Sequence, residues 1–208
     1  MNAGCFVVVE GPEGAGKTTL ATRLFRKMEE LRLHPVAVRE PGGTPVAEGA
    51  RRALLDHEPY SPMAEMFLFL AARADVVAGI IRPALAEGRV VLCDRYDLST
   101  EAYQVAGRGI DPGLFRAANG AATGGLRPDV TLVLDLPEGV GRARQLAAGK
   151  TGDRLDRESE AFHARVIAHY RAAKGAGVVH LDASLAADRV FEDAWGALVR
   201  ERGEMFGK

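Results

Sequence analysis

A glycine-rich segment near the N-terminus has the residue types and spacing of a phosphate-binding loop. Residues 11–18 read GPEGAGKT, which fits the pattern G-x-x-x-x-G-K-[ST] between an apolar run and a helical stretch. Glycines let backbone N–H groups converge on phosphate oxygens, and the dipole of the following helix favours negative charge. Lys17 would reach the β- and γ-phosphates, and Thr18 would offer its hydroxyl to Mg²⁺. The residues predicted to bind a nucleoside triphosphate are Gly11, Pro12, Glu13, Gly14, Ala15, Gly16, Lys17, Thr18 and Thr19.

The loop alone does not choose between an ATPase, a GTPase, a motor and a kinase. GTPases usually carry the base-reading string N-K-x-D, which does not occur in this sequence. A hydrolytic switch would also show D-x-x-G after a strand, whereas Asp94 at the end of VVLCD is followed by Arg95 and a tyrosine. We expect Asp94 to lie near Mg²⁺ and to act through water. The alternative is that Asp94 caps the next helix.

Arginine, aromatic and hydroxyl side chains near the other expected strand ends indicate a second phosphorylated ligand. Arginine is a natural fork for phosphate, and Phe69 lies one helical turn before Arg73, which pairs a stacking face with a donor. Taken singly, an arginine is usually a solvated surface residue and a phenylalanine a core residue. The candidates for this second site are Glu40 in REPGGT, Arg51, Phe69, Arg73, Arg95, Ser99, Tyr103, Gln104 and Arg108.

Short apolar runs alternate with helical stretches along the chain. Strands are expected at 5–10, 35–39, 90–94, 129–135 and 177–182. Helices are expected at 16–33, 45–55, 61–88, 98–106, 112–123, 138–148, 158–173 and 187–202, followed by a frayed tail. This alternation predicts an α/β fold of the three-layer P-loop NTPase kind, with a five-stranded parallel sheet and helices on both faces. Ligands then bind beyond the carboxyl ends of the strands, where the loop and the second site meet.

Composition bounds the class of protein. The 208 residues include 27 Lys and Arg against 28 Asp and Glu, with 47% hydrophobic residues, which argues against disorder and against a general nucleic-acid or membrane-surface binder. The two cysteines, Cys5 and Cys93, stand in apolar runs and are expected to be buried thiols. We expect no membrane span, no signal peptide and a cytoplasmic protein. The length predicts one domain over 1–208 with a lid at about 143–158.

Several longer motifs, in this order and spacing, resemble the thymidylate kinase (dTMP kinase) family. EPGGT and DRYxxST-x-AYQ are more specific to that family than the phosphate loop. The resemblance covers nearly the whole chain, and it implies phosphoryl transfer from ATP·Mg²⁺ to dTMP, giving ADP and dTDP, by a homodimer formed through the long helices. The segments that carry it are VVVEGPEGAGKTT, REPGGTPVAEGARRALL, FLFLAARA, VVLCDRYDLSTEAYQ, GRGID, RPDVTLVLDLP, DRLDRESEAFHARV and HLDAS.

The resemblance also implies roles around the acceptor's sugar and phosphate. Glu13 would accept a hydrogen bond from the 3′-hydroxyl. Arg51 and Arg95 would hold the 5′-phosphate. Ser99 would crowd position 2′ and so help to prefer a deoxyribose, while Tyr103 would pack beside the sugar.

Further roles concern the acceptor base and the donor adenine. By the same resemblance Phe69 would stack on thymine, Arg73 would reach a base carbonyl, and Gln104 would bond the base edge. Residues 182–184 would flank the donor adenine.

The lid would supply a positive charge that the phosphate loop lacks. Some family members carry an arginine inside the loop, where this chain has Gly14, as is usual for the bacterial, lid-arginine type. Arg154 would therefore close over the transferring phosphate, and Arg157 is the second candidate. With Lys17 and Arg95, Arg154 completes the predicted catalytic set.

Two alternatives stay open at this point. Ala72 stands where the family commonly has a polar residue, and Val105 follows the Tyr-Gln pair where a glycine is common. These departures leave phosphoryl transfer in place and bear on the acceptor base, so the first alternative is a nucleotide kinase of the same sheet with another acceptor. The second is a binding or regulatory P-loop protein without catalysis, against which the intact Lys17 and Arg95 argue.

Overall fold

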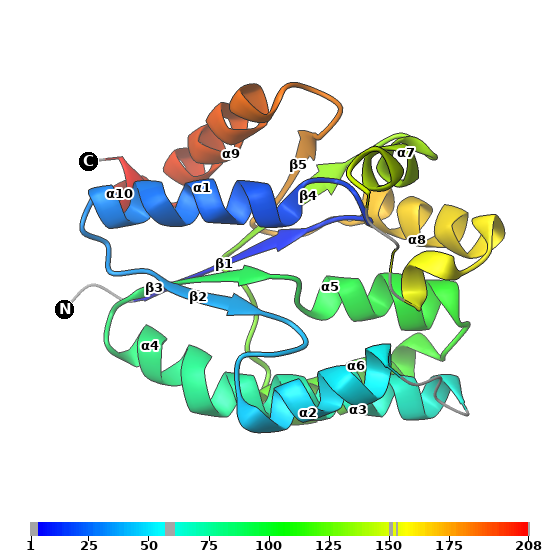
Figure 1. Ribbon diagram of the computed structural model, residues 1–208. Coiled ribbons are helices and arrows are strands. Elements are labelled where there is room, and N and C mark those ends of the chain that lie inside the picture. The colour runs from blue at the N-terminus through cyan, green and yellow to red at the C-terminus, as the bar shows by residue number, and fades with distance from the viewer. Residues whose placement is uncertain (1–3, 57–60, 150–151, 153, 208) are drawn as a thin grey trace.

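A parallel five-stranded sheet forms the middle layer of the molecule (Figure 1). The computed structural model describes residues 4–56, 61–149, 152 and 154–207, and the sheet lies within them. The strand order is β2-β3-β1-β4-β5, and the predicted α/β fold class with a five-stranded parallel sheet is confirmed. The strands are β1 Cys5–Glu10, β2 Val36–Arg39, β3 Val90–Asp94, β4 Val130–Asp135 and β5 Val178–Asp182.

The central position of β1 in the sheet explains why its sequence is apolar up to Glu10, its last residue. All six of its residues are buried, because helices cover both faces of the sheet and no face is left to alternate with polar residues. The register sets Val9 beside Asp94 of β3, and Arg39 of β2 beside Asp94 on its other side. The carboxyl ends of β1, β2 and β3 therefore bring charged residues to one edge of the sheet.

Helices cover the two faces and the carboxyl edge (Figure 1). One face packs against α1 and α9 through residues such as Leu24 and Leu198, and the other against the α3–α4 region through Val76 and Ile81. Helices α7 and α8 lie beyond the carboxyl ends of the strands. The bounds are α1 Lys17–Glu30, α2 Pro45–Leu55, α3 Pro62–Val76, α4 Arg82–Ala86, α5 Asp97–Thr100, α6 Pro112–Thr123, α7 Val140–Ala147, α8 Glu160–Ala172, α9 Ala187–Glu201 and α10 Gly203–Phe206.

The long helical tract predicted at 61–88 is present but changes its winding. A π-helical segment, Val77–Ile81, joins α3 to α4, whose second residue is Pro83. Proline lacks an N–H and its ring clashes with the preceding turn, so a wider turn accommodates it without ending the tract. A second π-helical segment, Glu101–Gly107, continues α5 and carries two of the predicted site residues. None of the described helices is long and apolar enough to cross a membrane.

Two expectations are wrong, one about the end of the first helix and one about the C-terminal tail. The helix predicted to reach residue 33 ends at Glu30, because Arg32 and His34 adopt left-handed backbone angles, with φ of 57° and 48°. The tail predicted to fray instead forms α10, in which Phe206 is 1% exposed and meets Trp195 edge to face at 5.7 Å. Burial of this aromatic ring helps to hold so short a segment against α9. Of the predicted lid, residues 150, 151 and 153 lie outside the described part of the chain, and its extent stays a prediction.

Candidate active site

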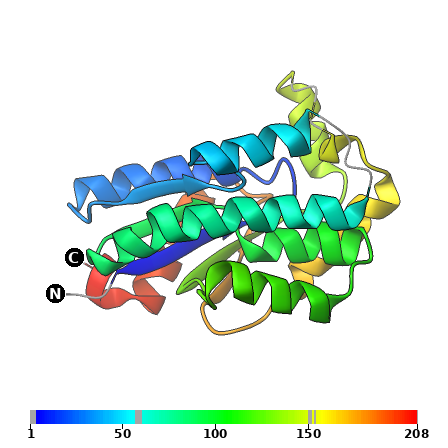
Figure 2. The same cartoon turned by 90° about the horizontal axis from the view of Figure 1, so that it is seen from below.

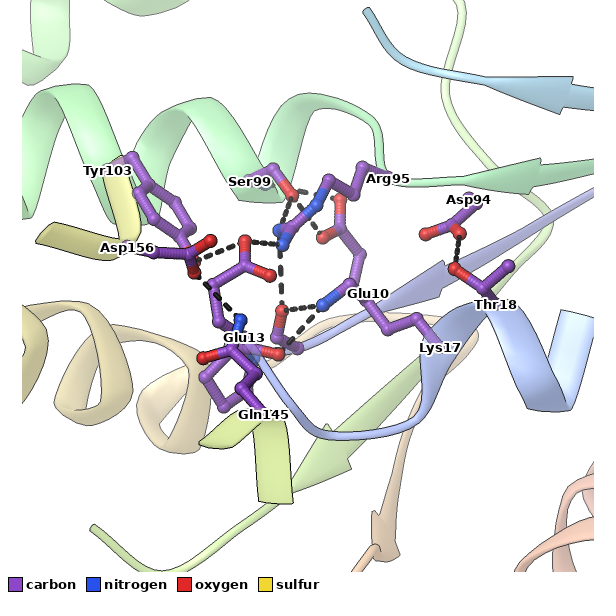
Figure 3. Close-up of polar contacts among 12 residues, drawn as sticks. Glu10, Glu13, Lys17, Thr18, Asp94, Arg95, Ser99, Tyr103, Gln145 and Asp156 are labelled. Carbon is purple, nitrogen blue, oxygen red and sulfur yellow. Dashed lines mark hydrogen bonds and ion pairs between the residues drawn. The ribbon is translucent and has the colours of Figure 1, made fainter. Parts of the chain in front are cut away.

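The phosphate-binding loop folds around the side chain of Lys17. Gly16, with φ of 92°, turns the chain from the loop into α1, whose first residue is Lys17. The Nζ atom donates to the carbonyl oxygens of Gly11 at 2.9 Å and Pro12 at 2.7 Å (Figure 3). Burial, reinforced by the cation of Arg95, lowers the pKa of Lys17 to about 8. The predicted loop therefore holds an ammonium group among backbone dipoles, at the wall of a cavity described below.

The predicted Mg²⁺ ligands lie together at the start of α1 and the end of β3. Thr18 donates its hydroxyl to Asp94 Oδ2 at 2.8 Å. A hydroxyl and a carboxylate are hard oxygen ligands, and Mg²⁺ usually takes only one or two protein oxygens beside substrate phosphates, so the pair fits this ion. Over the described residues no cluster of three His, Cys, Asp or Glu side chains could hold a metal. The phosphates of a nucleotide would have to complete the coordination.

Arg95 is the cation on which the site converges. Its backbone is left-handed, with φ of 73°, and directs the side chain toward the phosphate loop. The guanidinium pairs with Glu13 and lies 3.2 Å from Ser99 Oγ and 3.3 Å from the Tyr170 hydroxyl. Although burial favours the neutral acid, Arg95 and Lys17 hold the pKa of Glu13 at about 2. Both partners therefore stay charged, and the structure brings Glu13, Arg95 and Ser99 together, while their roles toward a substrate stay predictions.

A carboxylate that the sequence analysis did not select supports this arrangement. Glu10 is fully buried at the end of β1. One oxygen accepts from the backbone N–H groups of Tyr96 at 2.7 Å and Ser99 at 3.1 Å. The other accepts from the hydroxyls of Ser99 at 2.6 Å and Tyr170 at 3.2 Å. Glu10 rather than Asp94 thus binds the N–H groups at the start of α5, so the capping alternative for Asp94 is wrong.

One cavity of about 340 Å³ joins the phosphate loop to the predicted acceptor residues. Tyr103 donates to Glu13 at 3.2 Å at the boundary between the two parts. Arg51 donates to the Pro41 carbonyl at 3.0 Å, and Phe69 is half-buried in the wall. The predicted residues that line the cavity are Glu13, Gly14, Gly16, Lys17, Thr18, Thr19, Glu40, Arg51, Phe69, Arg73, Asp94, Arg95, Ser99, Tyr103 and Gln104.

Arg73 is more deeply engaged with the protein than its predicted base contact requires. It is 1% exposed, and its Nε donates to Glu40 Oε2 at 2.8 Å. Its terminal nitrogens donate to Asn119 Oδ1 at 2.8 Å and to Thr100 Oγ1 at 2.9 Å. Burial, against the charge of Arg73, raises the pKa of Glu40 to about 7. The pair forms the floor of the acceptor side, and the contact of Arg73 with a base stays a prediction.

The lid arginine is the one predicted catalytic residue that does not line the cavity. Arg154 pairs with Glu65 of α3 and donates from Nε to the Leu54 carbonyl at 3.1 Å. Arg157 is exposed on a short 3₁₀ turn, Leu155–Arg157. A role for Arg154 at a transferring phosphate would require it to leave Glu65, and that role stays a prediction.

Comparisons with known proteins agree with this geometry. The family model described as thymidylate kinase matches residues 9–194. The chain belongs to the thymidylate kinase family. A thymidylate kinase of Thermomicrobium roseum is 47% identical over 95% of this chain and 97% of its own, and one of Deinococcus radiodurans is 40% identical over 98% and 100%. A crystal structure of thymidylate kinase from Ehrlichia chaffeensis has a TM-score of 0.78 at 27% identity and covers 95% of this chain and 99% of that one.

Membership of the thymidylate kinase family confirms two predictions. The fold is the predicted α/β fold, and the protein is a nucleoside monophosphate kinase, which transfers a phosphoryl group. The alternative of a binding protein without catalysis has no support in these comparisons, since the relatives carry the name of an enzyme.

Gly14 has a structural reason to be glycine in this member of the thymidylate kinase family. Its φ is 72°, and a Cβ there would lie 2.2 Å from the carbonyl oxygen of Gly141. Conversely, a Cβ on Gly141 would lie 2.1 Å from the Glu13 carbonyl oxygen. Helix α7 therefore begins in backbone contact with the phosphate loop, and this arrangement has no room for an arginine at position 14.

Several side chains at the site escaped the sequence analysis. Tyr170 and Asn119 lie outside the motifs found in the sequence, and only the fold brings them to Arg95 and Arg73. Arg144 lines the cavity and donates to the Ala183 carbonyl at 2.8 Å, within the segment predicted to flank the donor adenine. The sequence could have indicated Glu10 as a site residue, because it is a charged residue at the end of an otherwise apolar strand.

The contact between α7 and the phosphate loop predicts the effect of one methyl group. Gly141→Ala should displace the loop, destabilise the protein by about 1–3 kcal/mol and raise the KM for ATP. Gly196→Ala in α9 is the matched control, because its Cβ would approach nothing closer than 3.5 Å. Chemical denaturation and initial rates at varied ATP measure both effects. Equal behaviour of the two variants would contradict the tight contact.

Proposed function

We propose that this protein transfers the γ-phosphate of ATP to dTMP, giving ADP and dTDP, with Mg²⁺. The observation that carries the proposal is that one cavity is lined both by Lys17 of the phosphate loop and Arg95 and by Phe69 and Gln104. The phosphoryl group could then pass from the donor triphosphate to the acceptor nucleotide inside one cavity, without entering bulk solvent. The name thymidylate kinase, carried by relatives that match over nearly the whole chain, supports thymine as the acceptor base.

The charges at the loop suit phosphoryl transfer. The reaction needs two phosphates in line and charge neutralised as a loose transition state forms. Lys17 would bind the donor phosphates, and Arg95 with Arg51 would hold the acceptor's 5′-phosphate. The acceptor phosphate is already an oxyanion, so the scheme requires no general base. Glu13, ionised beside Arg95, would accept from the 3′-hydroxyl and so orient the sugar.

The acceptor's base and sugar would meet a half-buried aromatic ring and fixed hydroxyls. Phe69 would stack on the base, with Gln104 at its edge. Ser99 would crowd position 2′ and so help to prefer a deoxyribose, with its own hydroxyl held by Glu10 and Tyr170. Tyr103 would pack beside the sugar at the Glu13 carboxylate. Glu40 and Arg73 would form the floor beneath the base.

Thr18 and Asp94 would hold Mg²⁺ beside the donor phosphates. The ion, when bound, supplies positive charge that neutralises the β- and γ-phosphate oxygens. The hydrogen bond between the two side chains keeps both oxygens at the carboxyl edge of β3 and the start of α1. Asp94 would act through water, as is common for this strongly hydrated ion.

We also propose a homodimer formed through the layer that contains the long helix. Figure 2 shows the α3–α4 tract lying between α2 and α6 on the outside of the molecule. Large apolar side chains on these three helices are exposed: Val46 by 57%, Phe67 by 50% and Leu114 by 42%. Covering them against a second copy would remove apolar surface from water. A cytoplasmic location is proposed as well, where Cys5 and Cys93 would remain reduced.

A panel of acceptors tests the proposed reaction. ADP release is coupled to a detectable signal with ATP, Mg²⁺ and, in turn, dTMP, dUMP, UMP, CMP, AMP, GMP and thymidine. We expect dTMP to give the highest kcat/KM and a metal chelator to stop the reaction. Best activity on an acceptor other than dTMP or dUMP would overturn the choice of base. ATP hydrolysis without transfer to any acceptor would overturn the reaction itself.

A second prediction concerns the lid arginines. Arg154→Ala should lower kcat by about 10³ or more, as removal of a transition-state arginine does in GTPases, with a small change in ATP affinity. Arg157→Ala is the matched control, because that side chain is exposed in the same turn. Single-turnover kinetics and nucleotide titrations separate the two effects. Loss of turnover in Arg157→Ala alone would assign the role to the other arginine.

A further inference from the structure

Glu65, in the first turn of α3, is a buried carboxylate that no predicted role uses. It is 2% exposed, and each of its oxygens has two donors. Oε1 accepts from Gln104 Nε2 at 2.9 Å and from Arg108 Nε at 3.1 Å. Oε2 accepts from Arg108 Nη2 at 3.2 Å and from Arg154. Although burial opposes the charge, these hydrogen bonds hold the pKa of Glu65 below its usual range, so the group is an ionised carboxylate.

An ionised carboxylate can only accept hydrogen bonds, and this decides which way the Gln104 amide is turned. The NH₂ end must face Glu65, because the opposite orientation would set the amide oxygen against a carboxylate oxygen. Gln104 is 1% exposed and lines the cavity, so it has little freedom to turn elsewhere. The amide oxygen is therefore the acceptor that Gln104 can present to a ligand.

We propose that Glu65 is a positioning residue that selects the acceptor base by fixing the Gln104 amide with its oxygen toward a base N–H. The inference rests on the proposed acceptor function of the cavity. Thymine and uracil carry an N–H at N3, whereas cytosine carries a lone pair there. With Glu65 ionised, Gln104 would accept from the N3–H of thymine and would meet cytosine acceptor to acceptor. An unmatched buried polar group costs about tenfold to a hundredfold in affinity.

A second carboxylate, that of Glu158, makes it possible to test the positioning role of Glu65 apart from its charge pairing with the arginines. Glu158 also binds the two arginines, with Oε1 2.6 Å from Arg108 Nη2 and 3.9 Å from Arg154 Nη1. No described contact joins Glu158 to Gln104. Neutralising Glu158 therefore removes charge from the same arginines and leaves the Gln104 amide in place, which makes it the matched control for Glu65.

The test compares the ratio of kcat/KM for dTMP to that for dCMP in Glu65→Gln, Glu158→Gln and the wild type. A glutamine at position 65 can present either its oxygen or its NH₂, so the Gln104 amide becomes free to turn. We expect the ratio to fall at least about tenfold in Glu65→Gln, mainly through the two KM values, and to stay at the wild-type value in Glu158→Gln. Where dCMP turns over too slowly, the ratio of dissociation constants from calorimetry replaces it.

Two further variants keep the inference falsifiable. In a Gln104→Met background Glu65→Gln should no longer change the ratio, because the amide through which Glu65 acts is gone. If Glu65→Gln does not fold, as judged by its circular dichroism melt, Glu65→Asp retains the charge and withdraws the carboxylate, and a smaller fall is expected. An unchanged ratio in the folded variant, or an equal fall in Glu158→Gln, would overturn the inference alone. A wild-type preference for dCMP would overturn the proposed function with it.

Discussion

The guanidinium of Arg95, whose side chain is 17% exposed, is the feature on which the rest of the site depends. A buried cation is costly unless it is paired and hydrogen-bonded. Here the phosphate loop contributes Glu13, the helix after β3 contributes Ser99, and α8 contributes Tyr170. The three partners come from segments far apart in the chain, so the cation can be satisfied only when the carboxyl edge of the sheet is assembled. One side chain thereby ties the proposed donor site to the proposed acceptor site.

The same arrangement anchors the two helices on either side of the predicted lid, α7 and α8. Helix α7 begins at Gly141 in backbone contact with the phosphate loop, where neither partner has room for a side chain. Helix α8 returns Tyr170 to Arg95, Ser99 and Glu10. The helices on either side of the predicted lid are thus held at the groups that would bind phosphate.

The sequence predicts well what depends on local pattern. Expected strands such as 35–39 and 129–135 differ from Val36–Arg39 and Val130–Asp135 by one residue, because apolar runs in a covered parallel sheet have abrupt ends. The phosphate loop is equally local, since its backbone course follows from its glycines and the adjoining helix. The prediction of a frayed tail is wrong because the ring of Phe206 is buried in the core. The pattern of the last six residues does not indicate that burial.

Contacts between side chains of distant segments could not be predicted. Tyr170 and Glu10 are 160 residues apart, and Gln104 and Glu65 are 39 apart, with no motif linking either pair. The pairing of Arg154 with Glu65 likewise depends on how α3 meets the lid, which spacing does not state. Such polar pairs form because a buried charge must find a partner, and the fold decides which partner is within reach.

The most direct test of the account asks whether Arg95 holds the acceptor's phosphate. Calorimetry would compare the binding of dTMP and of thymidine, which lacks the 5′-phosphate, to the wild type and to Arg95→Met. The account predicts that the wild type prefers dTMP by about tenfold or more, as a charge-assisted hydrogen bond allows. It also predicts that this preference, taken as the ratio of the two dissociation constants measured on the same protein, collapses in Arg95→Met. A preference for dTMP that survives the substitution undiminished would contradict it.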